Sequence, residues 1–324
     1  MGTADDPSAP GAVQATIEAA LDSAARSMGD PADREQDRLE LDRIAAGLDA
    51  AADRAADLLA GHLDDFAYEA AVPMRLPKAR VVALGGCERH AVAGARASQS
   101  DDGLSSAGLE GRALDIYVQH EIVEGPVADP LEDLLSWLAA SGEPDVRDRL
   151  IACADELSLA ELAAAARAWA GIDPRWWPRT QGSASVHLAD AVVRCEGRTD
   201  VELGGPLTGR PGVVVEVKRG RPHAAHLAEV THYALLVALR DGAVPALVAR
   251  WYPGGALATM PISIAVLESA ALRLGDAIGA WAEIASGRPP SEMPGPPCGW
   301  CPDAAVCPSF QASPDPFDPS GVDP

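Results

Sequence analysis

The spacing of apolar and polar positions predicts helices on both sides of a strand-rich centre. In residues 35–69, apolar side chains recur at steps of three and four, which is typical of an amphipathic helix. A helix packed on its own domain is the more frequent explanation of such a face, and an arm that binds a partner is the alternative. Residues 130–169 have the same period with a break near Pro144. We therefore expect a helical N-terminal region and a helical cap before the sheet.

The centre of the chain changes to strand-like composition. Residues 186–203 and 213–218 are rich in β-branched side chains and bounded by glycine and proline, which predicts two adjacent strands joined by a loop. Helical spacing returns over residues 224–240 and ends at Gly242.

A hairpin and a final helix complete the pattern. Apolar runs at 246–252 and 257–262 flank Gly254 and Gly255, a signal for a hairpin with a two-residue turn. An amphipathic helix follows at 264–286. Strand, strand, helix, hairpin and helix together indicate a mixed α/β layer fold.

Length and composition bear on the size of the core and on the cellular location of the protein. The chain has 324 residues, 48% of them hydrophobic, which is enough for one large core or two modest ones. No apolar stretch reaches the roughly 18 residues of a membrane span, and residues 1–20 lack the apolar segment of a secretion signal. We expect a cytoplasmic protein with no membrane contact. Residues 1–11 and the Pro-, Asp- and Ser-rich residues 309–324 are expected to be disordered.

The charge is strongly acidic but unevenly distributed. The net charge is −22, which disfavours phosphate backbones as partners. Residues 1–72 contain 5 Arg and 16 Asp or Glu, whereas residues 193–223 contain 6 Lys or Arg and 4 Asp or Glu. The local field in the centre therefore permits an anionic substrate.

Four of the six cysteines form a candidate ligand set. Cys298, Cys301 and Cys307 have C-x2-C-x5-C spacing after a proline-rich approach, and Cys87 lies far upstream. Four thiolates hold iron–sulfur clusters or zinc. Zinc sites usually use two C-x2-C pairs, and only one is present, so a cluster is favoured over zinc, free thiols and, last, disulfides. The two other cysteines are expected to be small buried side chains without a ligand role, namely Cys153 and Cys195.

Acidic and basic side chains meet on the second predicted strand. Because side chains alternate with period two, Glu216 and Lys218 share one face while Val215 and Val217 face the core. If Asp200 lies opposite on the preceding strand, two carboxylates converge beside a lysine. Such a pair binds Mg²⁺ or Mn²⁺ with water and phosphate completing the shell. An isolated Glu-x-Lys is more often a surface ion pair.

The order of these features resembles the RecB-like branch of the PD-(D/E)XK nucleases with iron–sulfur clusters, such as AddB-type subunits and CRISPR-associated RecB-like exonucleases. The resemblance covers about residues 79–310. It implies a restriction-endonuclease-like mixed sheet flanked by helices and closed by a C-terminal iron–sulfur clasp. It also implies Asp200 and Glu216 as metal ligands, Lys218 as the catalytic lysine and a [4Fe–4S] cluster on Cys87, Cys298, Cys301 and Cys307.

The resemblance divides the chain into five regions. These are an acidic helical N-terminal region (1–72), a segment with the first cluster cysteine and the helical cap (73–172), the nuclease core (173–288), the cluster-binding segment (289–310) and a disordered tail (311–324).

Two positions depart from the family pattern. The helix after the lysine usually carries Gln-x3-Tyr, and here Glu229 stands four residues before Tyr233, which we still assign to the catalytic set. Where the family has Gly-x3-His, this chain has Gly111 followed by Asp115. Asp115 and His120 are the two candidates to complete the metal site, and for each a solvated helical side chain is an equal alternative.

The implied substrate is single-stranded DNA or DNA ends, cleaved by hydrolysis to a 5′-phosphate and a 3′-hydroxyl. Trp176 and Trp177 are candidates to stack on bases, although core packing is the more frequent use. No P-loop sequence is present, so a helicase motor would be a separate subunit. Basic side chains near the catalytic set are candidates to follow the phosphate backbone or are simply solvated: Arg198, Arg210, Arg219, Arg221 and His223.

Two other functions are compatible with these residues. A non-catalytic adaptor would keep the fold and the cluster and would dock through the acidic N-terminal helix; the acidity, Glu229 and Asp115 favour it. A binding module stabilised by zinc is the weaker alternative.

Overall fold

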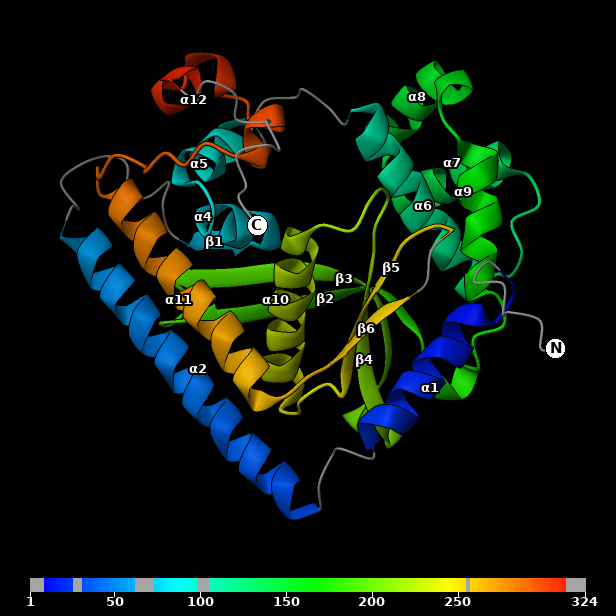
Figure 1. Cartoon of the computed structure of the whole chain (residues 1–324), viewed down its shortest axis with the longest axis horizontal. Coiled ribbons are helices and arrows are strands. Elements are labelled where there is room, and N and C mark those ends of the chain that lie inside the picture. Colours follow the sequence, from blue (N-terminus) through cyan, green and yellow to red (C-terminus); the bar gives the residue numbers. More distant parts are fainter. Residues whose placement is uncertain (1–8, 26–30, 62–72, 98–104, 255–256, 313–324) are drawn as a thin grey trace, which may run out of the picture. The chain divides into compact units, whose positions relative to one another are not determined.

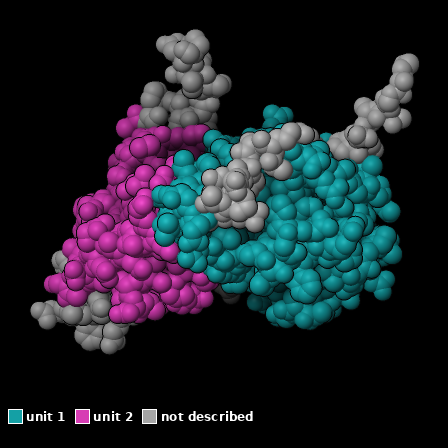
Figure 2. All heavy atoms as spheres, turned by 90° about the horizontal axis from the view of Figure 1, so that it is seen from below, with its two compact units in different colours: residues 1–41, 103–184, 198–267 teal, residues 42–102, 185–197, 268–324 magenta. Residues whose placement is uncertain are grey.

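The computed structural model describes residues 9–25, 31–61, 73–97, 105–254 and 257–312. The chain divides into two compact units, each discontinuous in sequence (Figure 2). Unit 1 comprises residues 1–41, 103–184 and 198–267, and unit 2 comprises residues 42–102, 185–197 and 268–324. The predicted α/β class is confirmed, because helices accompany a mixed six-stranded sheet.

The elements appear in Figure 1 with their labels. The helices are α1 (Ala12–Ala25), α2 (Pro31–Ala60), α4 (Lys78–Leu84), α5 (Glu88–Ala97), α6 (Ser106–Val123), α7 (Pro130–Ser141), α8 (Pro144–Cys153), α9 (Leu159–Ala166), α10 (Ala224–Asp241), α11 (Ile264–Ala285) and α12 (Pro308–Ala312). The strands are β1 (Met74–Pro77), β2 (Arg179–Leu188), β3 (Val193–Gly205), β4 (Arg210–Val217), β5 (Leu247–Trp251) and β6 (Ala258–Pro261). Short 3₁₀ turns lie at Ala154–Glu156, Arg167–Trp169, Pro174–Trp176, Pro206–Thr208, Pro296–Trp300 and Ala304–Val306.

The sheet of unit 1 mixes both pairing directions. The C-terminal half of β3 is antiparallel to β4, β4 is parallel to β5, and β5 is antiparallel to β6. Helix α10 is the crossover between the parallel strands β4 and β5, and it packs against both (Figure 1). This connection brings the start of α10 close to the end of β4.

The opposite face of this sheet forms the core of unit 1. Alternate valines of β4 are buried there with Trp251 of β5, and the Trp169 and Trp251 rings meet edge to face with centroids 5.8 Å apart. Helices α6, α7 and α9 and the apolar side of α1 complete this core. Because side chains alternate along a strand, the β4 side chains between these valines, Val214 and Glu216, face α10.

Unit 2 contains the N-terminal part of β3, paired in parallel with β1 so that Cys195 lies opposite Leu76. Within this unit, residues 42–60 of α2 run beside α11 (Figure 1). The helices approach closely at Gly275, where an added Cβ would lie 3.9 Å from the Ala51 side chain. The two small residues permit this contact.

Several predicted boundaries are wrong. The helix predicted at 35–69 begins at Pro31 and ends at Ala60; residues 62–72 lie outside the described ranges. The strand predicted at 186–203 is two strands, because Ala189, Asp190 and Ala191 adopt positive φ (48°, 51° and 69°) and form a turn. Strand β2 starts seven residues earlier than predicted, in a polar stretch without β-branched periodicity.

The loop and tail predictions also need correction. The hairpin of β5 and β6 has no two-residue turn, since its last pair is Arg250 with Ala258 and the loop is longer. Residues 309–312 of the predicted disordered tail belong to α12; residues 313–324 lie outside the described ranges. The break near Pro144 is confirmed, with Gly142 in a left-handed conformation ending α7. No described helix has the length and apolarity needed to cross a membrane.

Candidate functional site

The end of β4 places an acid and a base side by side. Glu216 is only 2% exposed, and its Oε1 accepts a hydrogen bond of 2.7 Å from Lys218 Nζ. The Lys218 backbone N–H donates to the Trp251 carbonyl at 2.8 Å, which extends the β4–β5 ladder by one residue. Sheet hydrogen bonding therefore fixes the direction in which both side chains leave the backbone.

Asp200 joins this pair from the neighbouring strand. The antiparallel register pairs Val201 of β3 with Val215 of β4. The next pair in this register is Asp200 with Glu216, and the two side chains therefore lie on the same face of the sheet. Asp200 Oδ2 accepts the Val217 backbone N–H at 2.7 Å. The two predicted ligand carboxylates therefore meet at one end of the β3–β4 pair.

Helix α10 contributes a third carboxylate. Glu229 Oε2 accepts a second hydrogen bond from Lys218 Nζ, so the ammonium bridges Glu216 and Glu229. Lysine is rare in this chain, with Lys78 as the only other one among 26 Lys and Arg residues. Glu229, at the position where the sequence departs from the expected amide, is thus part of the site.

One side chain near the lysine, His226, was not predicted from the sequence. His226 Nδ1 lies 3.0 Å from the Tyr252 hydroxyl, and burial followed by the nearby Lys218 charge lowers the pKa of His226. His223 caps α10 by accepting the Ala225 N–H at 3.1 Å. A histidine three residues after a helix cap has no distinctive sequence pattern, so the sequence alone does not indicate a role for His226.

The remaining site candidates occupy α10 and α6. Tyr233 is buried one turn after Glu229, with its ring 6.3 Å from the His232 ring. Asp115 is partly buried on α6, where its backbone carbonyl accepts the Gln119 side chain. His120 Nδ1 lies 2.8 Å from the Gly125 carbonyl and its Nε2 lies 3.4 Å from Glu124. The contacts with Gly125 and Glu124 hold His120 at the end of α6. Asp200, Glu216 and Lys218 are not among these contacts.

The basic residues predicted to lie near the catalytic set divide into paired and exposed ones, and Arg210 lies at the opposite end of β4 from Glu216. Arg219 forms an ion pair with the buried Glu110 of α6, and Arg210 lies over the Trp176 ring at 4.8 Å. Trp176 is buried in the core, whereas Trp177 is 65% exposed and adopts a positive φ of 49°. The side chains left facing solvent are Arg198, Arg221 and His223.

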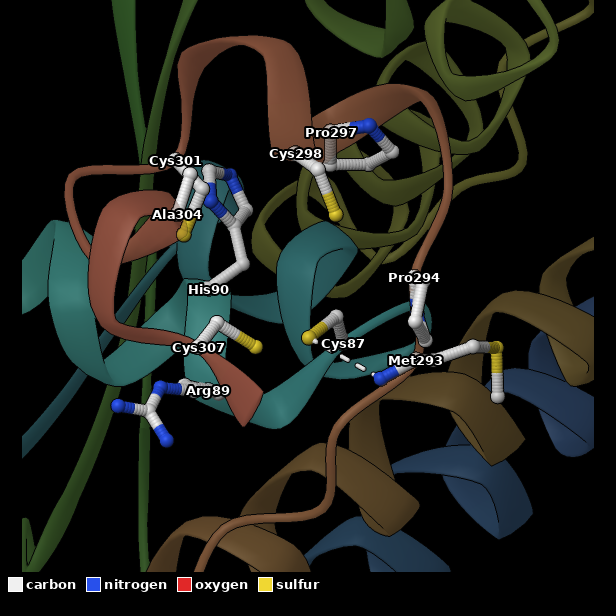
Figure 3. A pocket seen from close by; sticks show the side chains of 10 residues that line it. All are labelled: Cys87, Arg89, His90, Met293, Pro294, Pro297, Cys298, Cys301, Ala304 and Cys307. Carbon is white, nitrogen blue, oxygen red and sulfur yellow. Dashed lines mark hydrogen bonds between the residues drawn. The ribbon is translucent and has the colours of Figure 1, made fainter. Parts of the chain in front are cut away.

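Unit 2 contains the predicted cysteine set. Cys87, Cys298, Cys301 and Cys307 line one small cavity. Figure 3 shows these side chains gathered around a common space, with the His90 ring beside them. The Met293 N–H points to Cys87 Sγ at 3.5 Å and the Gly295 N–H to Cys298 Sγ at 3.4 Å. We call this site the thiol cavity.

Ion pairs hold the two chain segments of the thiol cavity together. Arg89, two residues after Cys87, pairs with Glu292 and Asp303. Arg288 makes bidentate hydrogen bonds of 2.8 and 2.9 Å to Glu88, and Glu88 also accepts the Ser291 N–H. Charge complementarity between α5 and residues 288–309 therefore brings together cysteines that are distant in sequence.

The thiol cavity has the donor chemistry of a metal–sulfur site. Burial raises the pKa of the Cys301 thiol, and nearby Asp303, Cys87 and Cys298 raise it further against an opposing hydrogen bond from the Asp303 backbone. Mutual repulsion of thiolates is relieved when they share a metal. Over the described ranges, no group of three or more His, Cys, Asp or Glu side chains has the arrangement of a preformed metal site. The fit of a metal–sulfur group to this site therefore rests on two observations: the four thiols line one cavity, and thiolate sulfur is the donor that such a group requires.

The other two cysteines lie elsewhere. Cys195 is fully buried in β3, and burial raises the pKa of its thiol to about 12. Cys153 donates to the Arg149 carbonyl within α8. Neither of them lines the thiol cavity.

Comparisons with known proteins give little help. No protein-family model matches the chain, and no curated protein matches it. Among solved structures, the chain is similar to one described as "Crystal structure of SSO0001", with 14% sequence identity and a TM-score of 0.33 over 79% of this chain and 94% of that one. A likeness this weak assigns neither a fold family nor a function.

Proposed function

We propose that this chain is a Mg²⁺- or Mn²⁺-dependent deoxyribonuclease of the RecB-like PD-(D/E)XK type, acting on single-stranded DNA or DNA ends in repair, recombination or defence. An exonuclease is favoured over an endonuclease. The observation that carries the proposal is the meeting of Asp200, Glu216 and Lys218 at one end of two paired strands. A surface ion pair would not account for it, because Glu216 is buried.

The donors at this end fit a hard divalent cation. Mg²⁺ takes one or two carboxylates and keeps several waters, so Asp200 and Glu216 are a sufficient protein contribution. When bound there, such an ion supplies Lewis-acid stabilisation of the phosphate and a water of lowered pKa. Asp115 stays a candidate further ligand, whereas the contacts of His120 make it the weaker one.

Lys218 contributes the positive charge of the site. Its ammonium already contacts a ligand carboxylate, so it lies within reach of a phosphate held at that carboxylate. In that position it orients the attacking water or stabilises the charge of the pentacovalent phosphorus. Tyr233, one turn beyond Glu229, belongs to the same helix and is assigned to the catalytic set on the resemblance.

The proposal extends to the fold and to the cofactor. A strand that carries Glu-x-Lys, antiparallel to the strand with the aspartate and parallel to the next, supports a restriction-endonuclease-like core. In unit 2, Cys87, Cys298, Cys301 and Cys307 would hold a structural [4Fe–4S] cluster. A separate helicase or other protein subunit is the proposed partner besides DNA.

Substitution of Lys218 tests the nuclease. Anaerobically purified protein is incubated with end-labelled single-stranded and duplex DNA and Mn²⁺ or Mg²⁺. We expect Lys218→Ala to lower the cleavage rate about 100-fold or more. Lys78→Ala is the matched control, since Lys78 is the other lysine and lies on α4 in unit 2. Equal cleavage by parent and Lys218→Ala would refute the assignment.

A non-catalytic iron–sulfur adaptor is the second candidate. The contact of Glu229 with Lys218 favours it, because it adds an acid beside the site in a chain of net charge −22. An adaptor would bind iron but show no metal-dependent cleavage above the level of Lys218→Ala. Metal analysis separates both from a zinc-stabilised module, since zinc in place of iron would fill the same four thiolates.

A further inference from the structure

His90 is the only imidazole that lines the thiol cavity in the described part of unit 2. It lies on α5, one turn after Cys87, so the helix that begins next to the first cysteine also carries it to the cavity (Figure 3). The resemblance assigns four cysteines and gives this histidine no role.

The polar atom of interest is His90 Nδ1. It is shielded from solvent and has no hydrogen-bond partner among the described residues. Leaving a buried ring nitrogen without a hydrogen bond destabilises the folded state. A histidine is therefore unfavourable at this position unless a hydrogen-bond partner for Nδ1 occupies the cavity.

A metal–sulfur group would be that partner. Thiolate and sulfide sulfurs accept N–H hydrogen bonds, and two backbone donors already point to Cys87 Sγ and Cys298 Sγ. Hydrogen bonds to cluster sulfurs stabilise the reduced, more negative state and raise the reduction potential. A neutral imidazole with its proton on Nδ1 would add one more donor to this set.

We propose that His90 is a hydrogen-bond donor to the sulfur of the metal–sulfur group in the thiol cavity and raises its reduction potential. The inference rests on the cofactor part of the proposed function and is independent of nuclease activity. It makes His90 a positioning and tuning residue and leaves the ligand set at four cysteines.

The test compares His90→Phe with the parent chain after anaerobic iron–sulfur reconstitution. Phenylalanine keeps a planar ring of similar size and lacks the donor. We expect unchanged iron and sulfide content and a shift of the midpoint potential to a more negative value. Met293→Leu is the control, because it changes a side chain of the cavity lining and keeps the backbone N–H that points to Cys87; its potential should equal that of the parent.

Four other outcomes decide the inference, and all but one of them overturn it. An unchanged potential in His90→Phe would mean that water or rotation satisfies Nδ1. Loss of iron in His90→Phe but not in His90→Gln, which keeps a side-chain donor, would support a structural need for the hydrogen bond; loss in both would make His90 a ligand and refute the donor role. Absence of iron from the parent chain would refute the cofactor itself and, with it, this inference.

Discussion

At the scale of single residues, Glu229 is the side chain that most directly opposes phosphate binding at the proposed site. It holds the Lys218 ammonium from α10 while Glu216 holds it from β4. A third carboxylate repels a phosphate and competes with it for the lysine. Under the proposed function, Glu229 therefore lowers the affinity for DNA and fixes the direction of the Lys218 side chain.

Replacing Glu229 by Gln should strengthen DNA binding. The amide keeps the shape and one acceptor but removes a negative charge beside the phosphate position. We expect KM for single-stranded DNA to fall about fivefold, corresponding to about 1 kcal/mol, with a smaller change in kcat. Glu132→Gln, an exposed acid on α7, is the charge-matched control. A KM that rises in Glu229→Gln would mean that the ion pair organises the lysine for catalysis.

Cys195 supplies a pH prediction for unit 2. Its folded pKa is about 12 because of burial, whereas an unfolded thiol has a pKa of about 8.5. The unfolded chain therefore loses its proton first, and stability falls above about pH 8.5, by up to about 1.4 kcal/mol per pH unit.

The measurement compares parent and Cys195→Ala by denaturant unfolding between about pH 7 and pH 10.5. The free energy of unfolding of the parent should decline more steeply at alkaline pH, and below pH 8 the two curves should run parallel. Identical slopes across the range would show that the thiol ionises in the folded protein.

At the scale of elements, a buried ion network joins β3 to α10. Glu202 accepts hydrogen bonds from Arg240 at 2.7 and 3.0 Å and from the Thr199 hydroxyl at 2.7 Å, and Arg179 of β2 also pairs with it. Glu202 lies two residues from Asp200 and on the same face of β3. The network therefore fixes the strand with the aspartate relative to the helix with Glu229.

Glu202→Ala should destabilise unit 1. It removes the buried carboxylate that Arg179 and Arg240 share, while Arg240 keeps its hydrogen bonds to Asp241, so we expect a loss of about 2–3 kcal/mol. The exposed pair of Glu35 and Arg38 is the contrast, because Glu35→Ala should change stability by less than about 0.5 kcal/mol. Chemical denaturation of both variants measures the difference. A loss below about 1 kcal/mol for Glu202→Ala would show that the network contributes little.

The strands also show which parts of the fold could be predicted from the sequence. A run of β-branched residues bounded by glycine and proline identified β4, and side-chain alternation placed Glu216 and Lys218 on one face, although all residues from Val213 to Val217 are buried. Strand β2 could not be found in this way, since its polar residues are held by pairing with β3 and by Arg240 donating to the Ser183 carbonyl. The turn at residues 189–191 was hidden because non-glycine residues adopt its positive φ angles. Tertiary contacts, which a local pattern does not contain, decide these features.

For the site, sequence order identified the acid pair, the lysine and the four cysteines because each has characteristic spacing. The partners Glu229, His226 and His90 depend on where α10 and α5 lie. Spacing along the chain therefore predicted which of these side chains lie together, whereas the residues around them depend on the fold.

At the scale of the whole molecule, each proposed site lies within one compact unit. The carboxylates and lysine belong to unit 1, and all four thiols belong to unit 2. Acidic charge concentrated in residues 1–72 leaves β3 and β4 in the more basic part of the sequence. The proposed cluster is therefore expected to stabilise its own unit and to take no part in the proposed chemistry at Lys218.

Removal of iron tests that separation. The cysteine segment of unit 2 has little apolar burial, with Met293, Trp300 and Val306 each more than 60% exposed, so bound metal would supply much of its folding free energy. In hydrogen exchange, we expect iron removal to speed amide exchange in α5 and residues 288–312 at least tenfold, while β4 and α10 keep their protection. Cys298→Ala should exchange rapidly in these segments before treatment and show no further change with a chelator. Equal loss of protection in α10 would make the cluster a support for the whole chain, and no change anywhere would remove the thiol cavity as its site.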